Sequence, residues 1–264
     1  MIVSSPKESQ IKFRFFDDIY KPKIEKLPLL VNVDIDHGRK VLNTEAECDK
    51  YIALYGGHHF HKLYAAFPST NFQYTEGKSI EIIDWGCGQA FATCVLMDYF
   101  IEKCISPKIE LITLIEPSSI ALWRGYNFVR QMLQPAFSNN SLITTVNKCI
   151  DNLNSSDLVS RSSSNIKIHL FSNILDVENF DLNKLYQLII SSVSGFNRII
   201  CTSPYNNARN YRIDRFYNLF NEYGMVKNSF YSDEAIYQEI FYNKIKKFKI
   251  SKIQRYERQF TIKL

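Results

Sequence analysis

A short apolar strand that runs into a glycine turn and then a helix constrains this chain most strongly. The run Ser79 to Asp84 (SIEIID) is followed by glycines at 86 and 88, and then by Phe91 to Glu102, which has helical spacing. Glycine allows a tight turn and lets the backbone approach a ligand, and the free N–H groups of the next helix point to the same place. This order predicts an α/β fold with a ligand site beyond the end of a buried strand.

Apolar runs and helical segments continue to alternate after this unit. We expect further strands and helices over 109–116, 118–133, 166–172, 182–191, 198–202 and 210–223. Strands that alternate with helices predict a doubly wound, mostly parallel sheet with helices on both faces. Such strands are near-continuous apolar runs because both of their sides are buried, and these runs fit that description. On this count, 166–172 is the third strand and 198–202 the fourth.

The two ends of the chain do not follow this alternation. Residues 235–243 and 250–264 contain strand-like stretches, which predict an antiparallel C-terminal hairpin at the edge of the sheet. Residues 1–75 precede the first strand, and we expect them to form a flanking or lid segment that is helical over 44–64, with an interruption at two glycines. Residues 76–264 are expected to form the ligand-binding domain.

The pattern of the glycine turn narrows the class of ligand. Its spacing is G-x-G-x-A, whereas a dinucleotide-binding turn requires G-x-G-x-x-G and this chain has Phe91 at the last position. The Gly-Lys-Ser/Thr of a phosphate-binding P-loop is also absent. Asp84 ends the strand directly before the turn, where its charge would repel a diphosphate and attract an ammonium group.

The segment Ile80 to Ala90 (IEIIDWGCGQA) resembles the first motif of the class I S-adenosylmethionine-dependent methyltransferases. That motif is an apolar strand ending in an acid, followed by a short glycine-rich turn, and here Ala90 replaces a third glycine. The resemblance covers residues 75 to 264. It implies a Rossmann-like methyltransferase that uses S-adenosylmethionine, and it implies cofactor contacts from Asp84, Gly86, Cys87, Gly88, Gln89 and Ala90.

A second part of the resemblance lies at the end of the next strand. Family members carry an acid there that binds the ribose hydroxyls, and Glu116, followed by Pro117, has that position here. A carboxylate accepts both hydroxyl donors at once. The spacing from Asp84 is longer than the usual roughly 20 residues of such units. A helix-capping acid is the alternative, although Ser118 is already a good N-cap candidate.

The later strands supply weaker matches. In the family, a polar residue after the third strand often binds the adenine amino group, and Asn173 or Asp176 fits that role, with Ile174 as an apolar wall. Amino-group methyltransferases carry Asp/Asn/Ser-Pro-Pro-Tyr/Phe after the fourth strand. The sequence Ser203-Pro204-Tyr205 resembles this motif with one proline, which implies a catalytic role in holding an amine. An ordinary turn after a strand is an equal alternative for both.

Three histidines lie close together in His58-His59-Phe60-His61. Only residues three or four apart share a helix face, so His58 and His61 lack a third ligand and we expect no metal. A lid that brings Tyr55 or His58 onto the cofactor is one interpretation. A partly buried helix with incidental histidines is the other, and the sequence favours it.

Composition limits the setting and the partners. Six cysteines form no C-x-x-C pair, no apolar signal core lies in Met1 to Phe16, and no apolar run reaches the roughly 18 residues of a membrane span. We therefore expect a reduced, cytoplasmic protein that does not contact membranes. The formal charge is +5, and eight basic residues against Glu257 lie in 243–263. This tail is either a solvated strand face or a contact for nucleic acid phosphates.

Three functions fit these features. The first is an active methyltransferase acting on RNA or protein, which the basic tail and the many aromatic residues favour over a small metabolite. The second is an enzyme that uses the same cofactor for another reaction. The third is a non-catalytic module that binds the cofactor, because a fold does not fix a function.

Overall fold

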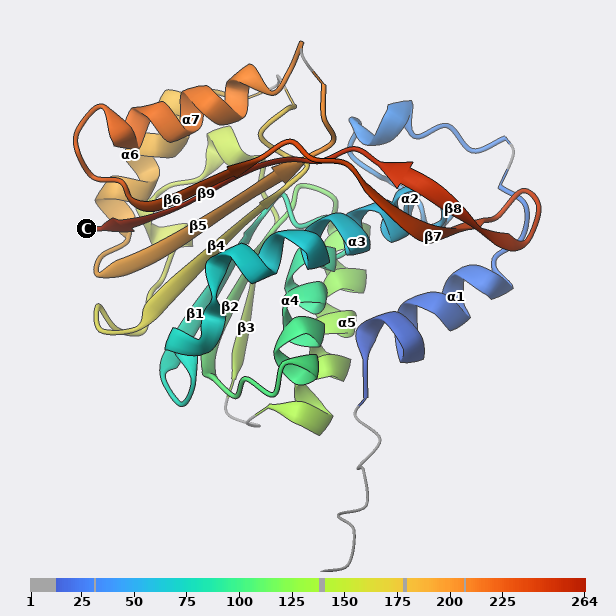
Figure 1. Cartoon of the computed structure of the whole chain (residues 1–264), viewed down its shortest axis with the longest axis horizontal. Helices are drawn as coiled ribbons and strands as arrows, with labels where there is room; N and C mark the ends of the chain where they lie inside the picture. The colour runs from blue at the N-terminus through green and yellow to red at the C-terminus, as the bar shows by residue number, and fades with distance from the viewer. Residues whose placement is uncertain (1–12, 31, 138–140, 178–179, 207) are drawn as a thin grey trace, which may run out of the picture.

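The computed structural model describes residues 13–30, 32–137, 141–177, 180–206 and 208–264. Its centre is a seven-stranded sheet, and a separate two-stranded ribbon lies beside it (Figure 1). The strands are β1 (Ser79–Trp85), β2 (Lys108–Ile115), β3 (Leu142–Val146), β4 (Ile166–Ser172), β5 (Phe196–Ser203), β6 (Lys227–Ser232), β7 (Ile236–Tyr242), β8 (Lys247–Ile253) and β9 (Tyr256–Lys263).

The order of strands in the sheet is β3-β2-β1-β4-β5-β9-β6. The first five strands are parallel, and β9 is antiparallel to both of its neighbours, β5 and β6. The predicted doubly wound, mostly parallel sheet is therefore confirmed. The strand order reverses between β1 and β4, and in open sheets of this kind ligands bind beyond the carboxyl ends of the strands at such a reversal.

Helices cover both faces of the sheet. On one face lie α3, α4 and α5, and on the other lie α6 and α7 (Figure 1). The helices, including two in the N-terminal segment, are α1 (Lys21–Lys26), α2 (Glu45–Tyr51), α3 (Gly57–Ala66), α4 (Phe91–Glu102), α5 (Ser119–Ala136), α6 (Leu182–Ser192) and α7 (Tyr211–Asn221). Side chains of β1 alternate between the two cores, with Ile80 and Ile82 in one and Ile83 and Trp85 in the other. This alternation explains why the strand reads as a continuous apolar run.

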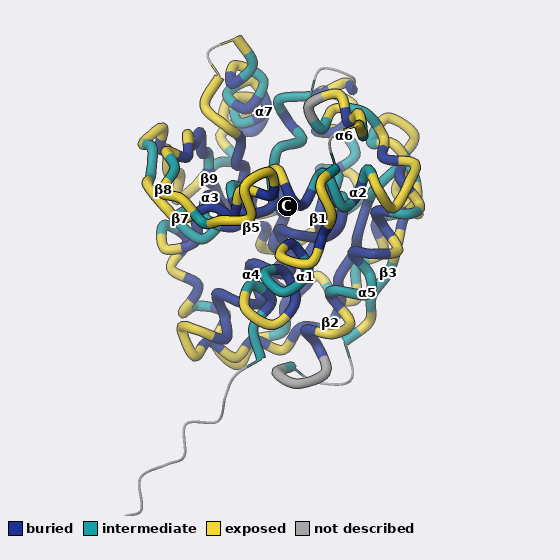
Figure 2. The backbone as a smooth tube through the Cα atoms, turned by 90° about the vertical axis from the view of Figure 1, so that its right-hand side faces the viewer, coloured by how far each residue is buried: buried dark blue, intermediate teal, exposed yellow. Residues whose placement is uncertain are grey.

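The N-terminal segment packs on the α3–α5 face and shares its core. Phe15, Ile24 and Phe67 are at most 1% exposed and belong to the same apolar cluster as Ile80. In Figure 2 the dark blue of buried residues follows α3, whereas α1 is largely half-buried or exposed. The described part of residues 1–75 therefore packs as an integral layer of the molecule.

The glycine pair does not interrupt the N-terminal helix, so that prediction was wrong. The chain stays helical from α2 through a π-helical turn (Ile52–Gly56) into α3. Gly56 is needed for packing, because a Cβ there would lie 2.6 Å from the ring of Tyr20. The close approach of Tyr20 to this helix explains the glycine, and the helix itself is not broken there.

Two edge strands were not predicted from the sequence. Most residues of β3 and β6 are exposed or half-buried, so neither strand is an apolar run. Because β3 was missed, the two strands that follow it in the chain were numbered one too low. Residues 166–172 form the fourth strand and 198–202 lie in the fifth.

The C-terminal hairpin also differs from the expected one. Residues 236–253 form the separate ribbon β7–β8, whereas β9 enters the main sheet between β5 and β6. Burial explains the division, because Phe260 and Ile262 of β9 are fully buried while Ile250 of β8 is 73% exposed. The predicted antiparallel edge exists, but β9 and β6 form it.

Candidate functional site

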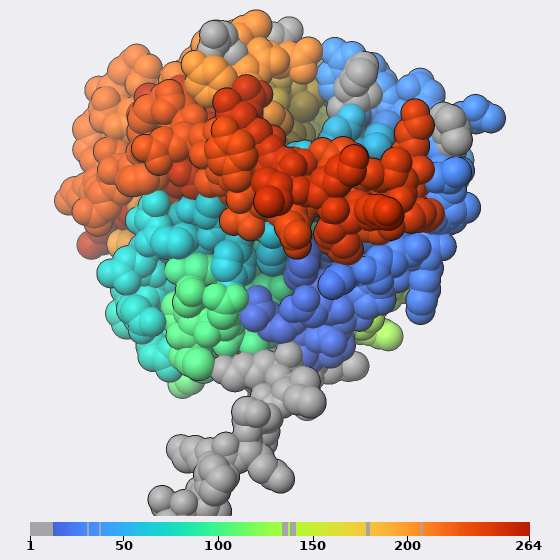
Figure 3. Space-filling model, turned by 45° about the vertical axis from the view of Figure 1, so that its right-hand side comes forward, coloured from blue at the N-terminus to red at the C-terminus, as the bar shows by residue number. Residues whose placement is uncertain are grey.

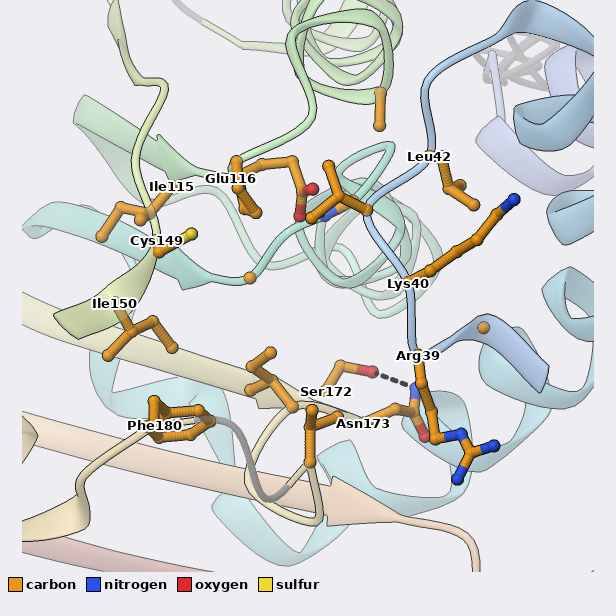
Figure 4. Close-up of a pocket in the computed structure, with 18 of the residues that line it drawn as sticks. Arg39, Lys40, Leu42, Ile115, Glu116, Cys149, Ile150, Ser172, Asn173 and Phe180 are labelled. Carbon is orange, nitrogen blue, oxygen red and sulfur yellow. Dashed lines mark hydrogen bonds between the residues drawn. The ribbon is translucent and has the colours of Figure 1, made fainter. Parts of the chain in front are cut away.

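A cavity opens where the carboxyl ends of β1, β2 and β4 meet, at the reversal of strand order (Figure 4). Its floor comes from the turn after β1, its sides from the loops after β2, β3 and β4, and its roof from residues 38–42 of the N-terminal segment. A smaller cavity adjoins it and shares residues of the glycine turn. Both positions are those that the β1 motif predicted.

The glycine turn needs small residues for two separate reasons. Gly86, Gly88 and Ala90 all have positive φ, at 60°, 52° and 55°. Helix α5 also approaches the turn closely, since a Cβ on Gly125 would lie 2.8 Å from the carbonyl carbon of Gln89. Gln89 itself donates from Nε2 to the Cys48 carbonyl at 2.9 Å, while its buried Oε1 has no hydrogen-bond partner among the described residues.

Asp84 is buried and caps the helix that follows the turn. Its Oδ2 accepts from the Thr93 backbone N–H at 3.2 Å and from the Thr93 hydroxyl at 2.8 Å. Burial raises the pKa of this carboxyl to about 7, although the two bonds from Thr93 act in the opposite direction. Asp84 lines the smaller cavity together with Cys87, Tyr51 and His59.

Glu116 lies at the end of β2 and points into the larger cavity (Figure 4). Its Oε2 accepts from the Gly88 N–H at 3.0 Å, and its Oε1 accepts from the Ser118 N–H at 2.9 Å. Burial raises its pKa. Each oxygen keeps a free lone pair for a ligand hydroxyl. Ser118 caps α5 by accepting from the Ala121 N–H at 3.0 Å, so the predicted N-cap is confirmed.

The loop after β3 forms a wall of the cavity that was not predicted from the sequence. Asn147 fastens this loop by donating to the carbonyls of Glu116 at 2.9 Å and Pro117 at 2.8 Å. Ile150 and Asp151 then line the cavity with Pro117. Recognition of β3 in the sequence would have predicted this wall, because Asn147, Ile150 and Asp151 would then follow the end of a strand.

Asn173 lies in the loop after β4, with φ 58°, and lines the larger cavity. Its N–H donates to the Thr202 carbonyl at 2.7 Å, and its Nδ2 donates to the Ser172 hydroxyl at 3.0 Å. Its Oδ1 accepts from the ammonium group of Lys62, which reaches it from α3. The carboxamide is thus held at both ends.

Lys62 is 2% exposed, and burial lowers its pKa to about 7. The unfolded chain therefore binds more protons than the folded chain between about pH 7 and the ordinary lysine pKa of 10.5, so the free energy of unfolding rises with pH across this window. We expect wild type to lose stability relative to Lys62→Met as pH falls through it, by up to about 1.4 kcal/mol per pH unit. Urea unfolding at several pH values measures this.

The matched control for this prediction is Lys184→Met, which removes an exposed lysine of α6. Its stability should follow that of wild type at every pH. A constant offset between wild type and Lys62→Met would contradict the prediction, because it would mean that Lys62 keeps an ordinary pKa.

Asp176 and the predicted catalytic residues lie beside the cavity. In the described part of the chain, Asp176, Ser203, Pro204 and Tyr205 line neither cavity. The Ser203 hydroxyl donates to Asp176 at 2.9 Å, and Tyr205 packs 6.1 Å from the ring of Tyr256. Ser203 ends the fifth strand and Pro204 and Tyr205 follow it, so the prediction that this segment follows the fourth strand was wrong, whereas Asp176 does follow the fourth strand.

The histidine segment presents different residues from those predicted. Tyr51, Tyr55 and His59 are four residues apart and lie along one helix face. Tyr51 meets Tyr55 edge to face at 5.3 Å between ring centroids, and Tyr55 stacks on His59 at 6.1 Å. Tyr51 lines both cavities and His59 lines the smaller one. Tyr55 and His58 are not among the described residues that line either cavity. Burial lowers the pKa of His59 well below its usual value. Neutral rings thus face Asp84.

The roof of the cavity is fixed to the body of the protein. Ser118 donates to the Leu42 carbonyl, and Arg124 of α5 pairs with Glu45 at 2.8 Å and Asp49 at 2.5 Å. These contacts hold α2 and the preceding extended segment over the site. No sequence pattern indicated them, because each joins residues that are far apart in the chain.

Three further properties concern metals, thiols and membranes. No group of three or more metal-ligating side chains is close enough to hold an ion in the described ranges. The six cysteines all lie in the described residues and form no disulfide with one another. Helices in the described part of the chain are too short or too polar to cross a bilayer.

No family model and no curated protein matches the sequence. The chain is similar to solved structures of S-adenosylmethionine-dependent methyltransferases. One, a putative enzyme from Methanococcus maripaludis, is 12% identical with a TM-score of 0.44, over 88% of this chain and 94% of that one. Another, from Leishmania major, is 12% identical with a TM-score of 0.44, over 90% and 82%. The Geobacter metallireducens precorrin-6y C5,15-methyltransferase is 10% identical with a TM-score of 0.39, over 89% and 98%.

Proposed function

We propose that this chain is an S-adenosylmethionine-dependent methyltransferase. The observation that carries the proposal is Glu116, a carboxylate whose two oxygens are oriented by the Gly88 and Ser118 N–H groups while they face the cavity. Those two backbone bonds fix the carboxylate without using all of its lone pairs. A vicinal diol of a ribose supplies the two donors that it still accepts.

The other residues around the site fit the same ligand. Asp84 offers a buried carboxylate to an ammonium group on the far side of the glycine turn. The unpaired Oε1 of Gln89 is an acceptor that needs a donor, because a buried acceptor without one is costly. Ile150 and Phe180 provide apolar walls for a flat base, and Asp151 follows β3, where the resemblance places the adenine contact. A diphosphate fits poorly beside two carboxylates.

When bound, this cofactor supplies an activated methyl group on a sulfonium. The protein then mainly positions the acceptor and excludes water. Ser172 and Asn173 stand where the loop after β4 meets the cavity, and Lys62 holds the Asn173 carboxamide in one orientation. We assign them to the acceptor side of the site. Residues 38–42 and Tyr51 form a fixed cover over the cofactor.

Isothermal titration calorimetry with S-adenosylmethionine and S-adenosylhomocysteine tests the proposal. We expect both to bind with micromolar Kd, and we expect NAD to bind far more weakly because of the two carboxylates. An absence of binding at millimolar ligand would overturn the proposal. Mass spectrometry of the products then separates methyl transfer from cleavage of the cofactor.

The pH dependence of cofactor binding is a further prediction. The pKa of Asp84 is about 7, and its ionised form attracts the ammonium group, so affinity for S-adenosylhomocysteine should rise as pH increases from about 6 to about 8, by up to tenfold per unit below the pKa. Asp84→Asn should bind weakly and show no such rise.

Asp98→Asn is the control for this titration, because Asp98 is a second buried carboxyl that bonds the backbone of Phe15 and Phe16 instead of lining the cavity. It should keep the pH dependence of wild type. A pH dependence that persists in Asp84→Asn would assign the titrating group to another residue, with Glu116 the next candidate.

A further inference from the structure

The ribbon β7–β8 leaves the sheet at the edge where the cavity opens. Ser232, the last residue of β6, pairs with Glu257 of β9, and Tyr256 pairs with Ser203, the last residue of β5. Residues 236–253 are therefore inserted at the carboxyl end of β5. Figure 1 shows the ribbon extending from this end toward α1 and α2.

A row of exposed tyrosines runs from the end of β5 onto the ribbon. Tyr205, Tyr231, Tyr237 and Tyr242 are 36%, 42%, 65% and 39% exposed. The buried ring of Tyr256 lies 6.1 Å from Tyr205 and 5.4 Å from Tyr231, so the row begins as one aromatic cluster. Aromatic rings left in water contribute little to a core, and together they form a surface for a flat ligand. We call these four residues the tyrosine row.

Each tyrosine of the row that lies on a strand has a basic residue directly opposite. Tyr231 pairs with Arg258, and its ring centroid lies 4.3 Å from the guanidinium carbon. The other two register pairs are Tyr237 with Lys252 and Tyr242 with Lys247. Directly opposed residues of an antiparallel pair project from the same face about 5 Å apart. Successive residues of a strand alternate between its two faces, so the Tyr237 and Tyr242 pairs project from opposite faces of the ribbon. Each face of the ribbon therefore carries one exposed tyrosine beside a lysine.

The ribbon carries a strong excess of positive charge. It holds a single acid, Glu239, against five lysines at 244, 246, 247, 249 and 252, all of them exposed. Asp233 and Glu234 lie at its base, before β7 begins. In Figure 3 the ribbon forms a continuous raised band across the face shown. A band of this charge attracts a polyanion.

The ribbon is a fixed platform. Lys246 donates to the Leu27 carbonyl, and the ammonium group of Lys21 lies 5.2 Å from the Phe248 ring centroid. Ile240 is buried against Gly57, where a Cβ would approach it to 3.1 Å. The tyrosine row is therefore held in place before any partner arrives, which lowers the entropic cost of binding.

We propose that the tyrosine row and its basic partners bind a single-stranded nucleic acid, and that this strand carries the methyl acceptor to the cavity. Unstacked bases stack on exposed aromatic rings, while the phosphates between them contact lysines and arginines. The ribbon offers both residue types, exposed tyrosines for bases and exposed lysines for phosphates. The acceptor part of the proposal rests on the proposed methyltransferase function, and the binding part does not.

Fluorescence anisotropy with a labelled single strand of about 20 nucleotides tests the binding. We expect RNA, DNA or both to bind, and we expect Lys247→Glu with Lys252→Glu to weaken binding at least tenfold and to lower the salt slope by about 1.4. Tyr237→Ala with Tyr242→Ala should weaken binding of the strand but not of heparin, which has no bases. The comparison of RNA with DNA identifies the natural strand.

The control variant is Lys108→Glu with Lys184→Glu, which reverses two exposed lysines of β2 and α6 and should bind as wild type does. Equal binding by wild type and the Lys247→Glu, Lys252→Glu variant would overturn the proposal, as would tighter binding of a duplex or an acidic peptide. Transfer of labelled methyl into the strand should show a raised KM and an unchanged kcat in the variant.

Calorimetry with S-adenosylhomocysteine keeps the two proposals apart. The ribbon variants should bind it with the wild-type Kd, because none of the substituted residues lines either cavity in the described chain. Cofactor binding without strand binding would refute the ribbon assignment alone. Strand binding without cofactor binding would refute the methyltransferase and leave the ribbon assignment standing.

Discussion

Glu116→Ala is expected to weaken binding of S-adenosylhomocysteine by about 100-fold. The carboxylate is proposed to accept two hydroxyl donors, and each such bond to a charged acceptor contributes about 1.5–3 kcal/mol. Loss of both corresponds to at least two orders of magnitude in Kd. Gly88, whose N–H it now bonds, lines the open cavity, so water replaces the lost oxygen there and the fold should survive. Calorimetry measures the change.

Glu110→Ala is the matched control, because Glu110 lies on the same strand at its other end and bonds Ser79 and Asn165. Its Kd for the cofactor product should equal that of wild type. Glu116→Gln keeps one acceptor oxygen and should fall between the two. A Kd for Glu116→Ala within threefold of wild type would remove Glu116 from the ligand and, with it, the observation on which the proposed function depends.

Gly86→Ala is expected to lower the free energy of unfolding by about 3 kcal/mol. A Cβ at this position would lie 2.6 Å from Cγ1 of Ile174, and overpacking of this kind costs about 1–3 kcal/mol. The backbone adds to this, since φ is 60° and an L-residue there costs about 1–2 kcal/mol. Urea unfolding, followed by circular dichroism, gives the difference.

Gly88→Ala separates the two causes. Gly88 has a φ of 52°, but no atom of the described chain lies within 4 Å of the position that a Cβ would take there, so only the backbone cost of about 1 kcal/mol remains. The clash itself is tested by adding Gly86→Ala to Ile174→Ala, where its cost should fall to the backbone value. An equal cost in both backgrounds would show that Ile174 does not contact this turn closely.

Local chemistry made the centre of the site predictable from the sequence. Asp84, the glycine turn and the following helix are contiguous, and the turn requires residues that tolerate positive φ. Glu116 was predictable because a buried parallel strand is an apolar run whose end can be read directly. In both cases the information lies within a short local stretch of chain.

The strand count failed for an equally physical reason. β3 is an edge strand with polar residues at the half-buried Thr144 and the exposed Thr145, so it lacks the apolar continuity that marks the inner strands. This single omission placed the expected adenine contact after β4 and gave Ser203 to Tyr205 a strand number one too low. An error in one weak element thus shifted the strand number of both later motifs.

By itself, the sequence determined the parallel sheet, its ligand edge and the carboxylates at the ends of β1 and β2, because each depends on local backbone rules. Only the tertiary structure decided what surrounds that edge. Lys62 on Asn173, Tyr51 over the cavity, and the tyrosine row all depend on contacts or register pairs between distant segments. Such pairings leave no periodicity in the chain, since their energy arises only when packing brings the segments together.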